Sequence, residues 1–226
     1  MRKKSIMMGW SGGKDSVYAY YEILNNPQYL GFTVTCAITT MTDGYNRISG
    51  HGVRHEVLKR QMELLGLPLH TSYIPKQSTM EEYETSMEKV LNEQREKNGD
   101  IIAFGDIFLK GVKKRRTANL EKIGMSYCSP LWGRKTADVL KSFIDLGFKA
   151  YVVCVDSKAL DISFAGRTID EDFIKDLPST VDPCGENGEY HSFVYDGPIF
   201  KEPLNCHKGE TVMRESFYFC DILLDN

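Results

Sequence analysis

A glycine-rich hexapeptide near the amino terminus combines the residue types that point most directly to chemistry. It consists of Ser11, Gly12, Gly13, Lys14, Asp15 and Ser16. An apolar run at residues 5–10 precedes it and a helical pattern follows it, so it joins a predicted buried strand to a helix. Backbone N–H groups and the helix dipole converge on an anion at such a junction. The hexapeptide therefore predicts a phosphate-binding loop, although a Gly-Gly pair alone would indicate only a tight turn.

The predicted loop is not of the Walker A type. That motif needs a glycine five residues before the glycine of its Gly-Lys pair and a serine or threonine after the lysine. This chain has Met8 and Asp15 at those positions. An acid inside a phosphate site is explained if Asp15 holds Mg2+ or caps the helix. We therefore expect a loop that grips the magnesium pyrophosphate unit of ATP, with Lys14 and Asp15 as catalytic residues.

An acidic, glycine-rich segment at residues 182–196 is the second candidate site. Its charged or titratable members include Asp182, Glu186, Glu189, His191 and Asp196. They are more numerous than a plain hairpin needs, and a flexible glycine backbone allows close approach to a ligand. If the segment is a site, Glu186, Glu189 and His191 are its candidate catalytic residues. The alternative interpretation is an ordinary strand at residues 190–195 with a charged, bulged entry.

Two other regions carry charged side chains that could reach a ligand. The connection 42–54 brings His51 and Arg54 to the start of a predicted helix. The two parallel N–H groups of the Arg54 guanidinium match the geometry of an oxyanion such as phosphate. A surface ion pair is the alternative for Arg54. The basic run at residues 113–116 covers every side of a helix, which is typical of a solvated surface. Arg116 is the member of that run we would single out for a ligand contact.

Arg134 follows a predicted strand end and could face the ligand, whereas Trp132 is predicted to pack beside the cleft. Zinc is not expected, because the residues that could bind it match no usual spacing. These residues are Cys184, His191, Cys206 and His207.

The elements that must position these residues alternate in type. Apolar runs are separated by helical patterns, two of which close at Gly66 and Gly147. The alternation predicts an α/β fold with a doubly wound, mainly parallel five-stranded sheet of the Rossmann-like kind, whose ligands lie beyond the carboxyl ends of the strands. The predicted strands are residues 5–10, 32–39, 69–74, 101–104 and 125–128, and a run at 150–155 completes the series.

The alternation of predicted strands and helices ends at about residue 157. A short helix, a loop and alternating strands follow, which together predict a small C-terminal α+β region. We therefore divide the chain into an ATP-binding domain at residues 1–156 and a substrate or acceptor region at residues 157–226.

Composition narrows the class of protein. Hydrophobic residues make up 42% and charged residues 26% of the 226 residues, near the globular average. No apolar run approaches the roughly 18 residues of a spanning helix, and no signal peptide is evident, so we expect a cytoplasmic protein without a membrane partner. A net charge of -3 provides no global attraction for nucleic acid. The six cysteines form no CxxC pair and are expected to be free thiols.

The hexapeptide resembles the PP-loop of the N-type ATP pyrophosphatases, and the whole chain is similar to the diphthine–ammonia ligase family and its bacterial ATP-binding relatives. The segments on which this resemblance rests are residues 11–16, 51–54, 104–109, 130–134, 164–167 and 182–194. The resemblance implies an adenine nucleotide alpha hydrolase-like fold and cleavage of ATP between its α and β phosphates. It also implies adenine contacts near Ile38, Thr39 and Gly105. Contacts to the second substrate are implied for His51, Arg134, Arg167, Glu186 and Tyr190.

The resulting hypothesis is an ATP-dependent ligase that adenylates a carboxylate, releases pyrophosphate and joins the carboxylate to ammonia or another amine. The resemblance implies, for the diphthine–ammonia ligases, a modified histidine carboxylate on the translocation elongation factor as acceptor. Here the acceptor is left open as a small molecule or a protein side chain, and a homodimer is compatible with the sequence. Two alternatives stand beside it: a non-enzymatic ATP-binding sensor, and a PP-loop tRNA-modifying enzyme. The missing CxxC pair and the acidic balance count against the latter.

Overall fold

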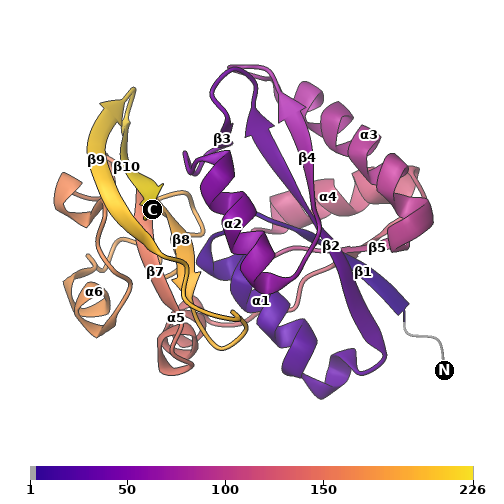
Figure 1. Ribbon diagram of the computed structural model, residues 1–226, viewed down its shortest axis with the longest axis horizontal. Coiled ribbons are helices and arrows are strands. Elements are labelled where there is room, and N and C mark those ends of the chain that lie inside the picture. Colours follow the sequence, from indigo (N-terminus) through magenta and orange to yellow (C-terminus); the bar gives the residue numbers. More distant parts are fainter. Residues whose placement is uncertain (1–3, 226) are drawn as a thin grey trace.

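A five-stranded parallel sheet forms the first half of the chain in the computed structural model, which describes residues 4–225 (Figure 1). Its strands follow the order β4, β2, β1, β5, β6. A short strand, β3 (Arg47–Ile48), pairs antiparallel with the end of β2. The parallel strands are β1 (Lys4–Gly9), β2 (Phe32–Thr42), β4 (Leu69–Ile74), β5 (Ile101–Ala103) and β6 (Ser126–Cys128). The predicted fold class is confirmed.

The strand order sets the place of the ligand. The chain runs from β1 outward through β2 and β4, and then returns to the other side of β1 for β5 and β6. The order therefore reverses between β1 and β5, and the crevice beyond their carboxyl ends is the switch point where doubly wound proteins bind ligands. The loops that follow these two strands, at residues 10–13 and 104–109, flank that crevice.

Four helices cover the two faces of this sheet. They are α1 (Lys14–Asn25), α2 (His55–Leu65), α3 (Met80–Asn98) and α4 (Lys110–Lys122), with a 3-10 turn η1 at Pro27–Tyr29. Neighbouring residues of β1 enter different cores, because strand side chains alternate between faces. Met8 packs with α1 and α2, whereas Met7 packs with Met87 of α3 and Leu120 of α4. A capping box formed by Thr79 and Glu82 begins α3.

A separate antiparallel sheet forms the second half of the chain, with the order β8, β7, β10, β9. Its elements are β7 (Lys149–Asp156), β8 (Tyr190–Asp196), β9 (Cys206–Arg214) and β10 (Phe217–Leu224). Helices α5 (Thr136–Asp145) and α6 (Glu171–Asp176) and the turn η2 (Ile162–Phe164) belong to this half of the chain.

The run at residues 150–155 corrects one sequence expectation. It was predicted to complete the parallel series, but as β7 it pairs antiparallel with β8 and β10. An apolar strand pattern does not reveal which sheet the strand joins, and both partners of β7 come later in the chain. Division at residue 156 would cut β7 from those partners, so we propose a boundary between residues 128 and 135.

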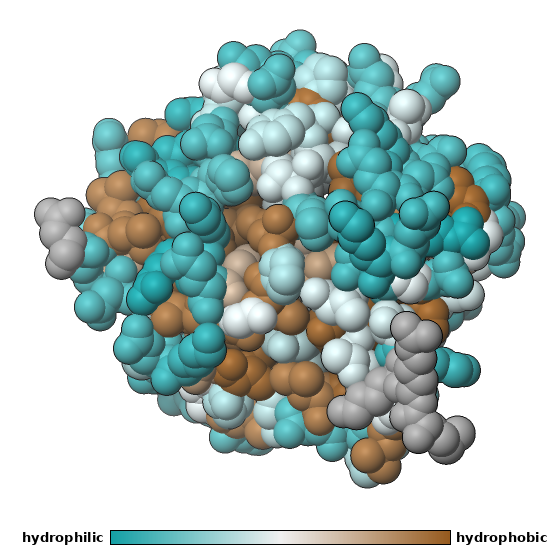
Figure 2. All heavy atoms as spheres, turned by 45° about the vertical axis from the view of Figure 1, so that its right-hand side comes forward, coloured by the Kyte–Doolittle hydropathy of each residue, from teal (hydrophilic) through white to brown (hydrophobic). Residues whose placement is uncertain are grey.

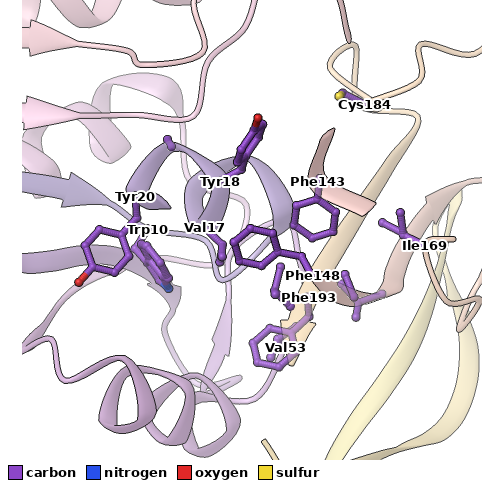
Figure 3. Close-up of a cluster of buried hydrophobic side chains, with 14 of the residues drawn as sticks. Trp10, Val17, Tyr18, Tyr20, Val53, Phe143, Phe148, Ile169, Cys184 and Phe193 are labelled. Atoms are coloured by element: carbon purple, nitrogen blue, oxygen red, sulfur yellow. The ribbon is translucent and has the colours of Figure 1, made fainter. Parts of the chain in front are cut away.

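The two halves share one hydrophobic core. Figure 3 shows Val17 of α1 beside Phe148, whose ring stacks on Phe143 of α5 with centres 4.9 Å apart. Polar contacts tighten the same interface at the Gly12 carbonyl, which accepts hydrogen bonds from Val194 N at 2.9 Å and from the Gln61 side chain at 3.0 Å. Strand β8 therefore lies directly against the glycine-rich loop.

The surface mixes polar and apolar side chains. On the face shown in Figure 2, hydrophobic residues lie in a band between two hydrophilic areas. Across residues 4–225, no helix is both long enough and apolar enough to cross a membrane.

Candidate active site

The two glycines of the loop are required by different local constraints. Gly12 has φ 75°, in the left-handed region that favours glycine. Gly13 precedes α1 as its N-cap, and a Cβ atom at this position would lie 2.8 Å from the Ser192 carbonyl oxygen. A side chain at Gly13 would therefore collide with β8 as well as obstruct the loop.

Two backbone amides at the start of α1 donate hydrogen bonds to serine hydroxyl oxygens. Lys14 N donates to Ser192 Oγ at 3.1 Å, and Gly13 N donates to Ser11 Oγ at 3.2 Å. The Ser16 hydroxyl donates to the Gly13 carbonyl at 2.9 Å. These amides are of the kind that bind anions at a helix N-terminus, so oxygen atoms already lie where such amides would hold a phosphate oxygen.

Lys14 is the buried cation of the loop, with only 3% of its surface exposed. Its Nζ donates to Asp15 Oδ2 at 2.9 Å and to the Cys184 carbonyl, and it lies 4.9 Å from the centre of the Tyr190 ring. Burial disfavours its charge, but the Asp15 carboxylate opposes this, and the pKa of Lys14 is raised above its ordinary value. Lys14 is therefore a permanent positive charge between the loop and the acidic segment.

Asp15 has one oxygen paired and one without a partner. Its Oδ2 binds Lys14, while its Oδ1 is buried and has no hydrogen-bond partner among residues 4–225. Such an oxygen suits a hard cation, and Mg2+ is commonly held by one or two carboxylates together with substrate phosphates and water. Within the described part of the chain no three His, Cys, Asp or Glu side chains cluster to form a metal cage. The residues present therefore fit Mg2+ brought in with a nucleotide.

A cleft of about 420 Å³ lies at the switch point and unites the two candidate sites. Its walls include the loop and β5 end on one side and residues 184–186 and 190–192 on the other. Sequence-predicted residues that line it include Ser11, Gly13, Lys14, Asp15, Ser16, Ile38, His51, Gly105, Glu186, Tyr190 and His191. The volume falls in the range of ligand pockets.

One end of the cleft is apolar. It is lined by Ile38, Tyr83, Met87, Phe104, Leu109 and Val112. Gly105 also lines the cleft, and a Cβ there would lie 2.5 Å from the Asp15 carbonyl carbon. Thr39, expected near the adenine, does not line the cleft, because Ile38 and Thr40 occupy the cleft-facing side of β2 and Thr39 lies between them with 2% exposure.

The two glutamates of the acidic segment lie in different environments. Glu186 lines the cleft and accepts a hydrogen bond from Ile107 N at 2.8 Å. Burial raises the pKa of Glu186 to about 7, and the charges of Asp15 and Asp106 add to the rise. Such a carboxylate can exchange a proton near neutral pH.

Glu189, by contrast, lies outside the cleft. Its Oε1 accepts from Asp182 N at 3.1 Å and its Oε2 from Asn187 N at 3.0 Å, and it does not line the cleft. These hydrogen bonds stabilise the carboxylate of Glu189, and its pKa is lowered although burial opposes this. In this geometry the carboxylate of Glu189 closes the turn of its own segment and does not face the cleft.

His51 and His191 approach each other from the two halves of the chain. His51 comes from the loop before α2 and His191 from β8, and their ring centres lie 4.5 Å apart. Tyr190, the residue before His191, is buried, and its hydroxyl donates to the Pro183 carbonyl at 2.6 Å. Tyr190 therefore presents the face of its ring, not its hydroxyl, to Lys14.

Three predicted arginines lie outside the cleft. Arg54 Nη2 binds Asp221 Oδ2 at 2.7 Å, Arg134 binds Glu22 through two contacts of 2.9 and 2.6 Å, and Arg167 Nη1 lies 2.9 Å from Asp176 Oδ2. Each guanidinium forms an ion pair with a carboxylate of the protein. The alternative of an ion pair for Arg54 is the one that the structure supports.

Sequence reasoning missed several contributors to the site. Gln61 joins the halves, because it donates to Gly12 O and to Val194 O and accepts from Trp10 Nε1 at 2.9 Å. Asp106 lines the cleft and binds Arg116 at 2.6 Å. Asp106 follows the β5 strand end, and that position could have identified it. Gln61 gave no signal, because a helical glutamine is ordinarily exposed.

The order of the sheet and the loop at its switch point define a doubly wound α/β protein with a candidate phosphate loop. The chain belongs to the diphthamide synthase family: residues 3–127 match the Diphthamide synthase N-terminal domain, and residues 135–224 match the Diphthamide synthase C-terminal domain.

Curated relatives agree with this assignment at low identity. Diphthine–ammonia ligases of Mus musculus and Homo sapiens are each 25% identical over 238 residues, covering 94% of this chain and 86% of theirs. The Schizosaccharomyces pombe enzyme is 25% identical, over 93% of this chain and 37% of its own length. A solved structure described as a predicted subunit of tRNA methyltransferase from Methanocaldococcus jannaschii has a TM-score of 0.45 and 15% identity, covering 66% of this chain and 79% of that one.

Proposed function

We propose that the chain is an ATP-dependent ligase that adenylates a carboxylate, releases pyrophosphate and transfers the activated acyl group to ammonia or another amine. One observation carries the proposal: the glycine-rich loop and the acidic segment, about 170 residues apart in the chain, line a single cleft. A loop alone would serve a nucleotide-binding module, whereas a ligase must bring a second reactant to the same phosphates.

The proposed orientation of ATP follows from the walls of the cleft. The adenine occupies the apolar end near Ile38 and Gly105, and the β and γ phosphates lie on the amides of residues 11–16. There they replace the hydroxyl oxygens of Ser11 and Ser192. Mg2+, when bound through Asp15 Oδ1, would offset the charge that develops at the α phosphate.

The chemistry requires no nucleophilic side chain. An acceptor carboxylate oxygen attacks the α phosphorus, the bond to the bridging oxygen breaks, and its electron pair leaves with pyrophosphate. Lys14 neutralises the departing group. The amine then attacks the acyl carbon, AMP leaves, and the amine proton passes to Glu186, whose pKa of about 7 suits a base at neutral pH.

The acceptor has space of its own beside the cleft. A second cavity of about 410 Å³ shares Ile48 and Gly50 with the cleft and lies between the β2–β3 connection and the β9–β10 hairpin. Its walls carry Arg47, Arg214, Glu210, Phe217 and Phe219. The mixed charges and aromatic rings suit the non-reacting part of a polar acceptor. The relatives are named for diphthine, which is the first acceptor to test.

Product analysis tests the proposal. The protein is incubated with ATP, Mg2+, ammonium and either a diphthine-bearing acceptor or a panel of other carboxylates, and nucleotides are separated by chromatography. We expect AMP and pyrophosphate, with a loss of about 100-fold or more in Lys14→Ala. Lys141→Ala, which removes an exposed lysine of α5, should keep full activity. ADP as the main product would overturn the chemistry, and bound ATP without turnover by any acceptor would favour a sensor.

A further inference from the structure

The stacked histidines at the loop are the strongest feature that the proposed reaction leaves without a role. His51 and His191 both line the cleft, with ring centres 4.5 Å apart and planes inclined by 36°. A Cβ on Gly13 would lie 3.4 Å from His51 Nε2, so the ring lies directly over the N-cap of α1. The pair is therefore beside the amides proposed to bind phosphate.

The pair also carries an unused hydrogen-bonding atom. His51 Nδ1 is buried and forms no regular hydrogen bond with the residues described, although the nearby Ser49 backbone favours the protonated ring. A buried polar atom without a hydrogen bond destabilises the state in which it is left unpaired. The ring nitrogen next to the amides proposed to bind phosphate is His51 Nε2, which would lie 3.4 Å from a Cβ on Gly13. A phosphate oxygen only accepts hydrogen bonds, so Nε2 must carry a proton to meet it, and the ring becomes an imidazolium when Nδ1 is protonated as well.

Without a ligand both rings are neutral. Removal from water, together with the charge of Lys14, lowers the pKa of His191 to about 4, and removal from water and the neighbouring His191 lower the pKa of His51 well below its ordinary value. The charged groups that share the cleft are Lys14, Asp15, Asp106, Arg116 and Glu186. Lys14 is the one that acts on both rings, and its positive charge opposes protonation.

We propose that His51 and His191 bind the pyrophosphate end of the nucleotide and that one proton enters the pair when the nucleotide binds. The inference rests on the proposed nucleotide site. The phosphates bring several negative charges next to the rings, which reverses the local field that Lys14 sets in their absence. The imidazolium N–H then donates to the oxygen that receives the electron pair when the α–β bond breaks, so the pair stabilises pyrophosphate as it leaves.

Proton uptake makes nucleotide affinity depend on pH in a defined direction. A group that gains a proton on binding strengthens binding as the pH falls. If binding restores a pKa near 6.5 in the pair, the affinity for ATP should be about fourfold higher at pH 6 than at pH 8, and about half a proton should be taken up at pH 6.5.

Calorimetry provides the test. The full chain is titrated at pH 6.5 with a non-hydrolysable ATP analogue and Mg2+ in buffers of different ionisation enthalpy, which reports the number of protons taken up. His51→Gln keeps hydrogen-bonding capacity but cannot take up a proton, so it should lose most of the uptake and of the pH dependence. His207→Gln is the matched control, because His207 lies on β9 paired with Asp225 at 2.5 Å. The ionisation of the analogue itself contributes equally to all three proteins.

The outcomes separate this inference from the proposed function. Proton uptake in the wild type that His51→Gln loses and His207→Gln keeps supports the pair. Binding without uptake, or uptake unchanged in His51→Gln, overturns the pair and leaves the ATP site standing. No binding at all overturns both. If His51→Gln fails to fold, His191→Gln takes its place, and the buffer dependence of the wild type alone can still overturn the inference.

Discussion

Glu186 and Glu189 lie three residues apart, and the structure gives them opposite environments. Glu186 faces the cleft with its pKa raised, while Glu189 accepts hydrogen bonds from its own turn with its pKa lowered. Enzymes commonly separate the roles of neighbouring carboxylates in this way. We therefore propose that, of these two residues, only Glu186 transfers a proton.

The role of Glu186 has a pH signature. As a base it must be ionised, so acceptor-dependent AMP release should rise with pH up to a value near 7 and then level off. Glu186→Gln should remove this rise and lower the rate by about 10²–10⁴-fold. Glu189→Gln should leave the rate nearly unchanged and lower stability by about 1 kcal/mol, because it weakens hydrogen bonds to the turn. A rate loss confined to Glu189→Gln would reverse the assignment.

At the scale of elements, local features were predictable and long-range pairing was not. The loop between β1 and α1, the capping box of α3 and the close of α2 at Gly66 follow from neighbouring residues. The partners of Arg54 and Arg134 lie 167 and 112 residues away in the chain, and no local pattern reveals them. The pairing of β7 with later strands was missed for the same reason.

The contact between the end of β5 and the start of α1 leads to a prediction. Gly105→Ala would bring a Cβ to 2.5 Å from the Asp15 carbonyl carbon, so the first turn of α1 must move. We expect ATP affinity measured by calorimetry to fall by at least about tenfold, or about 1.4 kcal/mol. Gly111→Ala in α4 is the matched control, since a Cβ there meets nothing within 4 Å. It should leave affinity unchanged and stabilise the helix by up to about 1 kcal/mol.

At the scale of the whole molecule, one carboxylate ties the halves together. Asp221 of β10 binds Arg47 at 2.7 Å and Arg54 at 2.7 Å, and both arginines belong to the connection ahead of α2. Although burial opposes it, the two guanidinium groups lower the pKa of Asp221 to about 2. The connection that carries His51 is therefore fixed by the C-terminal sheet.

This anchor should be measurable as stability that depends on pH. Because the pKa of Asp221 is lowered in the folded state, its contribution is present above the ordinary aspartate pKa and is lost as the pH falls toward 2. Asp221→Asn should destabilise the protein by about 1–3 kcal/mol at pH 7, seen by denaturant unfolding, and the difference should shrink in acid. Asp172→Asn, in an exposed pair with Lys175, should leave stability nearly unchanged. Equal losses in the two variants would show that the anchor is unimportant.

The hydrogen bonds that the glycine-rich loop receives from β8 bear on how genetic data for this family are interpreted. The Gly12 carbonyl is held by Val194 and Gln61, and Lys14 N by Ser192. Of these partners, Gln61 and Val194 do not line the cleft, yet each fixes the atoms that do. A screen for alleles that lose nucleotide binding will therefore recover changes scattered over both halves of the chain. Their positions will map a network of supports, and only a minority will mark contacts with the ligand.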